Sequence, residues 1–355
     1  MRLLICAPDI FSGDAVGNHC RGIARAARRL GMTANLYARR YDTGGARVHP
    51  LAELFTTVRP DDIVLLSYSI FDPDLERIAQ LNCRKICYFH GVTTPDLLRA
   101  FEPRTAQLCE DALGQLPMLA GFDVLIANSL FSTQALAQVA DPASIEIIPP
   151  VVPDMYPFRR SGAPLASTHP VPEMLVVGRV VPHKGIEDAI EIVHALRESG
   201  TAVRLSIVGS TPNFDYSKFL INHARKLGVL DAVDFRGVLD DADLLDRFER
   251  CAMLLVTSRH EGFCVPVLEA MQLGKPVLVR GGTAAEELCP RENVLAADAS
   301  INTWAEAAAR LLALTKAQRD QSSEHYRNHA GAILARTADD VWRSMVTRLT
   351  AENTK

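Results

Sequence analysis

Several signatures that would place the protein in a familiar class are missing from its 355 residues. No run of about eighteen apolar residues occurs, so no membrane-spanning helix is predicted. The N-terminal stretch MRLLICAPDI is too short an apolar run for a secretory signal peptide. The eight cysteines are scattered without zinc-ligand or redox spacing, which indicates reduced thiols and favours the cytoplasm.

Other absences concern ligands. No Gly-x-Gly-x-x-Gly follows a predicted strand, which argues against a dinucleotide dehydrogenase. No cluster of His, Cys or Asp has metal-ligand spacing, so no bound metal and no cofactor are expected. The formal net charge is −4, and no global basic field points to nucleic acid as a partner.

What the chain does contain is a regular alternation of short apolar runs and amphipathic segments. Strands are predicted at 3–7, 62–68, 85–90, 123–129, 174–180, 203–210, 233–239, 252–258 and 275–280. Helices are predicted at 19–31, 186–200, 217–229, 244–251 and 266–274. This order predicts an α/β protein with parallel sheets. Prolines and small residues gather at 147–173, which indicates two α/β halves with a ligand-binding cleft between them.

The stretch SRHEGFCVPVLEAMQLGKPVLV places Glu261 before a predicted helix and Glu269 within its first turn. Pro266 suits the start of this helix, whose N-terminus would face the carboxyl end of the preceding strand. Free amides and the helix dipole favour a phosphate there, and Gly262 allows the backbone to approach it closely. Glu269 could then accept both hydrogens of a vicinal diol such as a ribose. The ordinary alternatives are a helix-capping role for Glu269 and a solvated loop charge at Glu261.

A second stretch, VVGRVVPHKGIEDA, holds two cations at a strand-to-helix turn. Arg179 follows the strand, and Lys184 comes just before an acidic helix start. Two such cations could bind a diphosphate and stabilise it as a leaving group without a metal ion. The alternative is a surface loop with ordinary charges.

A local basic face is predicted on the first helix, where arginines recur at i, i+4, i+7 and i+8. These residues are Arg21, Arg25, Arg28 and Arg29. The common explanation of such a face is solvation. The sharper hypothesis is contact with anionic lipid or a lipid-diphosphate-linked acceptor, worth about 1 kcal/mol per residue at a membrane surface.

These motifs resemble a known family. HEGFCVPVLEAMQLGKPV resembles the E-x7-E signature of the retaining GT-B glycosyltransferases of family GT4, also called glycosyl transferases group 1, and GRVVPHKG resembles their diphosphate-binding turn. CYFHG, DVLIANSLFS and IEIIPPVVP resemble further segments of the family. The resemblance implies two Rossmann-like domains facing across a cleft. Residues 1–160 would bind the acceptor, residues 161–336 the nucleotide-sugar donor, and a C-terminal helix at 337–355 would pack back on the first domain.

The resemblance also implies roles for single residues. Arg179 and Lys184 would bind the donor diphosphate. Glu269 would hold the ribose hydroxyls, and Glu261 would contact the transferred sugar. The remaining implied positions are Gly262, Phe263 and Cys264 (backbone amides to sugar and phosphates), Val238 (backbone contact to the base), Gly13 (first glycine loop) and His90 (beside the reactive face of the sugar). The alternative for His90 is a structural role at the end of a strand, with its hydrogen bonds made within the protein. The first loop departs from the family, because its glycines are separated rather than paired.

The implied function is retaining transfer of a hexose from GDP-mannose, as a mannosyltransferase, or from a UDP-hexose. The acceptor would be a hydroxyl of a glycan or lipid-linked glycan, at the inner face of the cell membrane, in the synthesis of a surface polysaccharide such as lipopolysaccharide. Two alternatives stay open: a non-catalytic nucleotide-sugar-binding subunit, and another GT-B enzyme such as an epimerase or a phosphorylase. The two glutamates and two cations favour the transferase over both.

Overall fold

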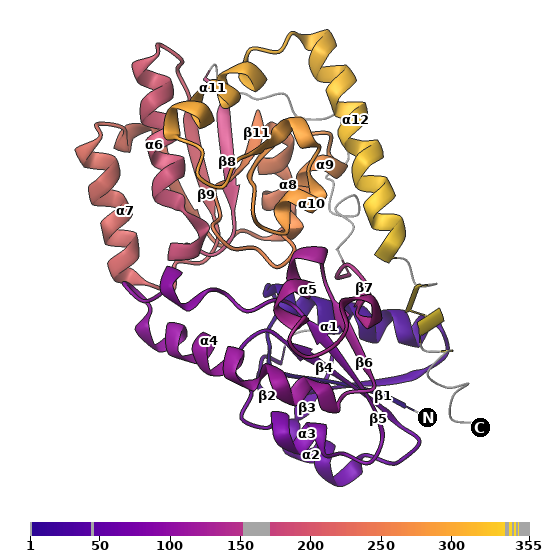
Figure 1. The fold of residues 1–355 in the computed structure, drawn as a ribbon. Helices are drawn as coiled ribbons and strands as arrows, with labels where there is room; N and C mark the ends of the chain where they lie inside the picture. The colour runs from indigo at the N-terminus through magenta and orange to yellow at the C-terminus, as the bar shows by residue number, and fades with distance from the viewer. Residues whose placement is uncertain are drawn as a thin grey trace. The chain divides into compact units, whose positions relative to one another are not determined.

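The computed structural model describes residues 2–43, 46–151 and 171–337, together with residues 341, 342, 344, 345 and 347. These residues form two compact units (Figure 1). The first unit holds the described residues up to 92, residues 107–151 and those from 334 onward, and the second holds 93–106 and 171–333. Most of the proline-rich segment predicted at 147–173 lies outside the described residues.

The first unit is built on a seven-stranded parallel sheet with the order β3-β2-β1-β4-β5-β6-β7. Its strands are β1 (Arg2–Ile10), β2 (Thr33–Tyr41), β3 (Val48–Pro50), β4 (Ile63–Tyr68), β5 (Arg84–Phe89), β6 (Val124–Ala127) and β7 (Glu146–Ile147). Its helices are α1 (Ala15–Arg29), α2 (Leu51–Thr57), α3 (Leu75–Ala79), α5 (Leu130–Leu136) and, from residue 107 onward, α4 (Pro103–Gln115). Every residue of β4 is buried, as expected of a central strand covered on both faces.

The second unit repeats this plan with a six-stranded parallel sheet in the order β10-β9-β8-β11-β12-β13. Its strands are β8 (Glu173–Val177), β9 (Arg204–Val208), β10 (Val233–Gly237), β11 (Met253–Val256), β12 (Val277–Arg280) and β13 (Val294–Leu295). Its helices are α6 (Ile186–Glu198), α7 (Phe214–Lys226), α8 (Asp241–Arg250), α9 (Val265–Gln272), α10 (Ala285–Leu288), α11 (Ile301–Leu312) and α12 (Lys316–Leu334). Helices α6, α7 and α11 bury their apolar faces on one side of the sheet, and α8 to α10 lie on the other (Figure 1).

Both sheets have a strand order that reverses once. The chain winds outward in one direction from β1 and in the other from β4, and likewise from β8 and β11. In open α/β sheets, ligands bind beyond the carboxyl ends of the strands at such a reversal. The fold therefore places one candidate crevice in each unit.

The segment 93–106 follows β5 in the chain but packs within the second unit, whereas the sequence had assigned all of 1–160 to the first domain. Asn213 donates to the carbonyl of Phe101 at 2.7 Å. The ring of Phe101 lies 5.1 Å from that of Tyr216 and 5.4 Å from that of Phe219. These contacts fasten the segment to the start of α7.

Of the C-terminal helix predicted from residue 337, only five residues from 341 onward are described. Trp342 and Met345 are buried in the core cluster of the first unit, among residues of β1, β2, β4 and α1. The described part of this segment thus packs with the first unit, and the rest of the predicted helix lies outside the described residues.

The predicted basic face on α1 is wrong for Arg21. That side chain is only 6% exposed and donates to Asp42 at 2.7 Å. Arg25, Arg28 and Arg29 are exposed. The four arginines therefore do not form one continuous exposed surface. In the part of the chain that the structure describes, no helix combines the length and apolar character needed to cross a membrane.

Candidate functional site

The crevice of the second unit is formed by the turns that follow β8 and β11. The turn after β8 contains a short 3-10 helix, Pro182–Lys184, that leads into α6. Two hydrogen bonds tie this turn to the loop after β11. The amide of Arg259 donates to the carbonyl of His183 at 2.8 Å, and the hydroxyl of Thr257 donates to the carbonyl of Lys184 at 3.1 Å. The two sequence motifs, far apart in the chain, thus meet at the predicted edge of the sheet.

An ion pair joins the two motifs directly. The ammonium of Lys184 lies 2.7 Å from a carboxylate oxygen of Glu261, and both side chains are mostly buried. Burial acts to lower the pKa of Lys184, but Glu261 outweighs it and the pKa lies above its usual value. Lys184 therefore carries a full positive charge where a diphosphate was predicted to bind.

Two glycines allow the backbone segments around the ion pair to lie close together. A Cβ added to Gly178 would lie 3.4 Å from Cε of Lys184. A Cβ added to Gly209, at the end of β9, would lie only 2.0 Å from the carbonyl oxygen of Gly178. The φ of Gly209 is +148°, which side chains other than glycine rarely allow. Glycine at these strand ends lets the neighbouring turns lie against each other.

Glu269 is the most unusual group of the site. It is the fifth residue of α9 and not part of its first turn, so the predicted position and the helix-capping alternative are both wrong. The residue is 7% exposed, and its carboxyl has no hydrogen bond or ion pair among the described residues. Burial, with a smaller contribution from Asp241, raises its pKa to about 7. A buried carboxyl without a partner fits a group that acquires its hydrogen bonds from a ligand.

The N-terminus of α9 also faces this crevice. Its N-cap, Cys264, has the left-handed backbone conformation at φ 73°, and no side chain caps the helix. Phe263 and Cys264 are buried, and Pro266 stands in the first turn as predicted. An N-terminus without a side-chain cap suits an anion.

Two residues predicted to contact the nucleotide-sugar donor are more exposed and lie on the same sheet edge. Arg179 is exposed, but its charge helps to lower the pKa of the neighbouring His183. Val238 is 75% exposed and follows Gly237, the last residue of β10. Both positions remain reachable from solvent.

Sequence reasoning missed His183. It is 7% exposed, and its Nδ1 atom is buried with no hydrogen-bond partner in the described structure. Burial first, and then the charge of Lys184, lower its pKa to about 2, so the ring is neutral. Its place directly before Lys184 was the one available signal.

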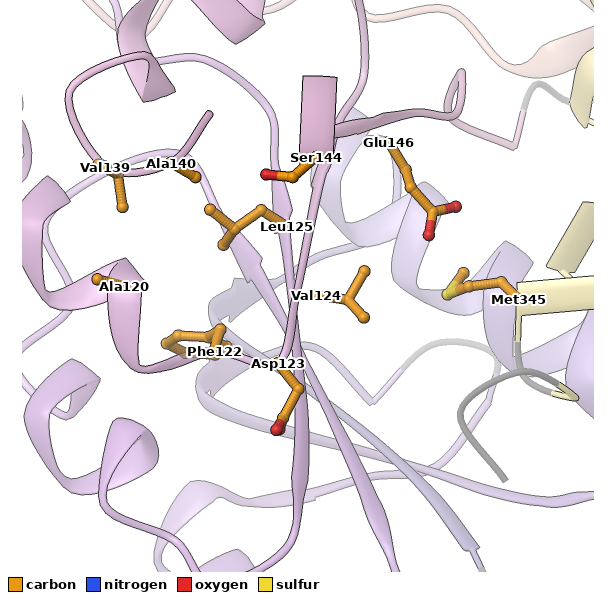
Figure 2. Close-up of a pocket in the computed structure, with 10 residues that line it drawn as sticks. All are labelled: Ala120, Phe122, Asp123, Val124, Leu125, Val139, Ala140, Ser144, Glu146 and Met345. Carbon is orange, nitrogen blue, oxygen red and sulfur yellow. The ribbon is translucent and has the colours of Figure 1, made fainter. Parts of the chain in front are cut away.

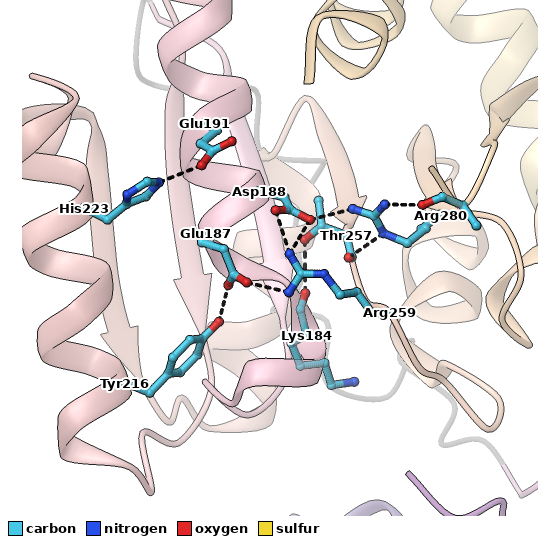
Figure 3. A network of polar contacts seen from close by, with 10 residues as sticks. Lys184, Glu187, Asp188, Glu191, Tyr216, His223, Thr257, Arg259 and Arg280 are labelled. Carbon is cyan, nitrogen blue, oxygen red and sulfur yellow. Dashed lines mark hydrogen bonds and ion pairs between the residues drawn. The ribbon is translucent and has the colours of Figure 1, made fainter. Parts of the chain in front are cut away.

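A network of ion pairs behind the crevice was also missed (Figure 3). Arg259 binds Asp188 through both carboxylate oxygens at 2.8 and 2.9 Å and also contacts Glu187. Arg280, at the end of β12, donates to Asp188 at 2.6 Å and to the carbonyl of Thr257 at 3.0 Å. The network clamps the loop that carries Glu261 to the start of α6.

The other predicted positions lie in the first unit. His90 follows β5, and its Nε2 atom lies 2.6 Å from Oγ of Ser67. Gly13 lies in the loop after β1, at φ 78° and with open space around its Cα. Asp14 then caps α1 by accepting from the amide of Gly17. These residues occupy the crevice edge of their own unit.

Two hollows lie away from the predicted residues. One of about 340 Å³ is lined by residues around β6, including Phe122, Val124, Glu146 and Met345 (Figure 2). The other, of about 860 Å³, lies beyond β12 and β13 and includes Gly282 and His329. Neither is lined by a residue of the predicted site. No group of three or more His, Cys, Asp or Glu side chains within the described ranges is placed to hold a metal ion.

Comparisons with known proteins agree with the motifs. Residues 163–328 match the family described as Glycosyl transferases group 1. A D-inositol 3-phosphate glycosyltransferase of Gordonia bronchialis is 32% identical over 232 residues, which cover 61% of this chain and 49% of the relative. The chain spans about half the length of the curated relatives it matches. Over residues 163–328 the chain is therefore similar to the glycosyl transferases group 1.

Solved structures define the fold. Sucrose-phosphate synthase from Thermosynechococcus elongatus superposes with a TM-score of 0.74 at 18% identity, over 98% of both chains. The Alr3699/HepE protein of Anabaena, solved with UDP and glucose, superposes with a TM-score of 0.73 at 16% identity, over 99% of this chain and all of the other. The protein therefore has the GT-B fold of two Rossmann-like α/β units.

Proposed function

We propose that the protein is a glycosyltransferase that moves a hexose from a nucleoside-diphosphate sugar to a hydroxyl group. One observation carries this proposal. The Lys184–Glu261 ion pair lies where the strand order of the second sheet reverses, and the buried Glu269 lies in α9, the helix that follows β11 at that reversal. A cation for a diphosphate and a carboxyl for a diol are what a nucleotide sugar requires there.

The proposed donor site has three parts. Arg179, Lys184 and the N-terminal amides of α9 bind the diphosphate. Glu269 accepts the hydrogens of the two ribose hydroxyls, which supply the partners that it lacks in the free protein. Glu261 contacts the transferred sugar, and the open backbone around Val238 contacts the base.

Lys184 has a specific part in this scheme. In the free protein its charge is held by Glu261 at 2.7 Å. When a diphosphate binds, its negative charge competes for the same ammonium. Glu261 is then less strongly held and can accept hydrogen bonds from sugar hydroxyls. The ion pair thus preorganises both residues for the donor.

The chemistry is departure of the nucleoside diphosphate from the anomeric carbon. Negative charge builds on the leaving phosphate, where Lys184, Arg179 and the dipole of α9 stabilise it. The acceptor hydroxyl attacks from the face that the phosphate leaves, its proton passes to a phosphate oxygen, and configuration is retained. No protein nucleophile and no metal ion takes part in this scheme.

The donor candidates are UDP-hexoses and GDP-mannose, with UDP favoured by the UDP and glucose bound to the Anabaena protein. The acceptor proposed from the motifs is a glycan or lipid-linked glycan in the cytoplasm. A polyol phosphate is a second acceptor class, favoured by the name of the Gordonia bronchialis relative.

The test is product formation. The full-length protein is incubated with each UDP-hexose and with GDP-mannose, alone and with glycan and inositol-phosphate acceptors, and release of nucleoside diphosphate is measured. The product's anomeric configuration is then read by NMR. Lys184→Ala should lower turnover by about 100-fold or more, the cost of removing a donor that stabilises a developing anion. Lys226→Ala, on the exposed surface of α7, should not.

Two results would contradict the proposal. Donor binding without release of nucleoside diphosphate with any acceptor would favour a binding subunit. Turnover that survives Lys184→Ala would place the reaction elsewhere in the molecule.

A further inference from the structure

Helix α7 carries the most exposed large apolar side chain among the described residues. Phe214, its first residue, is 78% exposed, and Ile221 on the same helix is 36% exposed. The opposite face of α7 packs into the core of the second unit through Tyr216, Leu220 and Ala224. Exposed apolar side chains scattered singly are ordinary, so the groups around these two decide what they mean.

Phe214 and Ile221 alternate with two cations along one line of the helix. The spacing of the four residues is i, i+4, i+7 and i+11, which places them on one face. They are Phe214, Lys218, Ile221 and Arg225, all of them exposed, and we call them the α7 stripe. The one acidic residue of the helix, Asp215, lies about 100° further round from Phe214. The α7 stripe therefore combines apolar and positively charged groups.

The positive charge of the α7 stripe is not neutralised within the described structure. Neither Lys218 nor Arg225 has an ion-pair partner among the described residues. On the neighbouring helix α6, Glu191 binds His223 at 3.0 Å instead. The whole chain has a formal net charge of −4, but charges farther away than about 8 Å are largely screened at physiological ionic strength. The α7 stripe is thus a local basic patch.

The first turn of α7 is fixed by its surroundings. The side chain of Asn213 accepts a hydrogen bond from the amide of Tyr216 at 2.8 Å and donates one to the carbonyl of Phe101 at 2.7 Å. The rings of Phe101 and Tyr216 lie 5.1 Å apart. Within the second unit, α7 lies on the opposite side from α12 (Figure 1). The exposed position of Phe214 is therefore part of the folded structure and not the result of a loose loop.

The chemistry of the α7 stripe fits the surface of an anionic phospholipid bilayer. Aromatic and aliphatic side chains enter the boundary between headgroups and acyl chains, while lysine and arginine are attracted to the lipid phosphates. A second copy of the chain fits less well, because an isologous contact would place the cations of one copy against those of the other.

We propose that the α7 stripe docks the protein on an anionic phospholipid surface. Phe214 and Ile221 enter the headgroup boundary, and Lys218 and Arg225 lie against lipid phosphates. The binding is peripheral and reversible, because two apolar side chains and two cations supply much less affinity than a membrane-spanning helix. The surface differs from the basic face predicted on α1. Its test needs no nucleotide sugar, so the result does not depend on the proposed function.

The first test is co-sedimentation of the full-length protein with vesicles. One set contains phosphatidylcholine alone, and the other contains equal parts of phosphatidylcholine and phosphatidylglycerol. We expect binding to the anionic vesicles only, and we expect added salt to weaken it because salt screens the attraction. Equal binding to both sets would overturn the proposal. No binding to anionic vesicles at low salt would also overturn it and leave an acidic protein as the partner that fits the α7 stripe.

Variants then assign the binding to α7. Lys218→Ala and Arg225→Ala should each weaken binding to anionic vesicles about fivefold, the effect of one cation at a membrane surface. Phe214→Ala should weaken it about tenfold, through the loss of buried apolar area. The matched controls are Arg319→Ala, an exposed cation on α12, and Met118→Ala, an exposed apolar side chain of the first unit. Both controls should bind as the wild type does, and equal losses in controls and stripe variants would overturn the proposal.

Sedimentation equilibrium without lipid tests the second copy as the partner. The wild type and Phe214→Ala should have the same molecular mass, because the α7 stripe does not hold two copies together. An assembly of the wild type that Phe214→Ala dissociates would overturn the proposal in favour of a second copy. Melting temperatures of the stripe variants should match that of the wild type, because the replaced side chains are exposed.

Discussion

Replacement of Glu269 by glutamine should stabilise the protein while it weakens donor binding. The carboxyl is buried without a partner, and its pKa is raised from 4.5 to about 7. A glutamine has nearly the same shape but never carries a charge. The free energy that the wild type loses by ionising this buried group is therefore retained in the variant.

The magnitude follows from the pKa values. The difference between 4.5 and about 7 corresponds to about 3 kcal/mol of unfolding free energy, at about 1.4 kcal/mol for each pH unit. Below pH 4.5 the carboxyl is protonated in both the folded and the unfolded chain, and the substitution should change little. As the pH rises to 7, ionisation favours the unfolded chain, and the wild type loses stability relative to Glu269→Gln. Above pH 7 the difference should stay constant.

The assay is thermal unfolding of the two proteins between pH 4.5 and pH 8.5, followed by circular dichroism. We expect equal melting temperatures at the acid end. Near pH 8 the variant should melt several degrees higher, at roughly 2–4 °C per kcal/mol for a unit of this size. Glu306→Gln, on the exposed face of α11, is the control and should show no pH-dependent gain. Equal stability at every pH, or a less stable variant at pH 8, would refute the description of Glu269 as an unpartnered buried carboxyl.

Three further predictions concern the framework of the site. Lys184→Met leaves Glu261 buried without its cation and should lower the free energy of unfolding by about 3 kcal/mol or more. Adding Glu261→Gln to this variant should recover part of the loss in a double-mutant cycle followed by urea unfolding. Losses that simply add would contradict the pairing. Gly209→Ala brings a Cβ within 2.0 Å of a backbone oxygen at a φ that favours glycine, and should cost at least about 2 kcal/mol. Gly114→Ala, with open space around it, should cost nothing, and equal unfolding midpoints for the two variants would be the contrary result. Arg259→Lys keeps the charge but loses the bidentate contact to Asp188 of α6. Donor affinity should therefore fall while the melting temperature changes little. Unchanged affinity would show that the Arg259–Asp188 contact does not hold the loop of Glu261.

Much of the fold could be predicted because the central strands are continuous apolar runs. The runs at 62–68 and 252–258 correspond to β4 and β11, whose residues are all buried. Strand β2, with the sequence TANLYARRY, was missed because its exposed arginines mask the apolar positions. Short edge strands such as β13 carry too few residues to leave a pattern.

The sequence singled out the residues of the candidate site but not the contacts between them. Lys184 and Glu261 are 77 positions apart, and their pairing depends on two turns meeting at one sheet edge. The helical spacing of Arg21 predicts an exposed side chain. In the structure the side chain is buried and donates a hydrogen bond to Asp42, a contact that the sequence does not show. Glu269 was assigned to the first turn because the helix was predicted to begin at 266. The helix begins one residue earlier, at Val265, and the left-handed conformation of Cys264 before it gives no signal in the sequence.

The most direct test of the central claim is equilibrium binding of UDP-, GDP-, ADP- and dTDP-sugars to the wild type, Lys184→Ala, Glu269→Gln and the control Glu306→Gln. We predict that one nucleotide class binds the wild type and the control, that Lys184→Ala weakens it by charge, and that Glu269→Gln weakens it by loss of the diol contact. A donor present at about one hundred times its dissociation constant should also stabilise the protein by roughly 2.7 kcal/mol. No binding of any class, or binding that both site variants retain, would contradict a nucleotide-sugar site between the ends of β8 and β11.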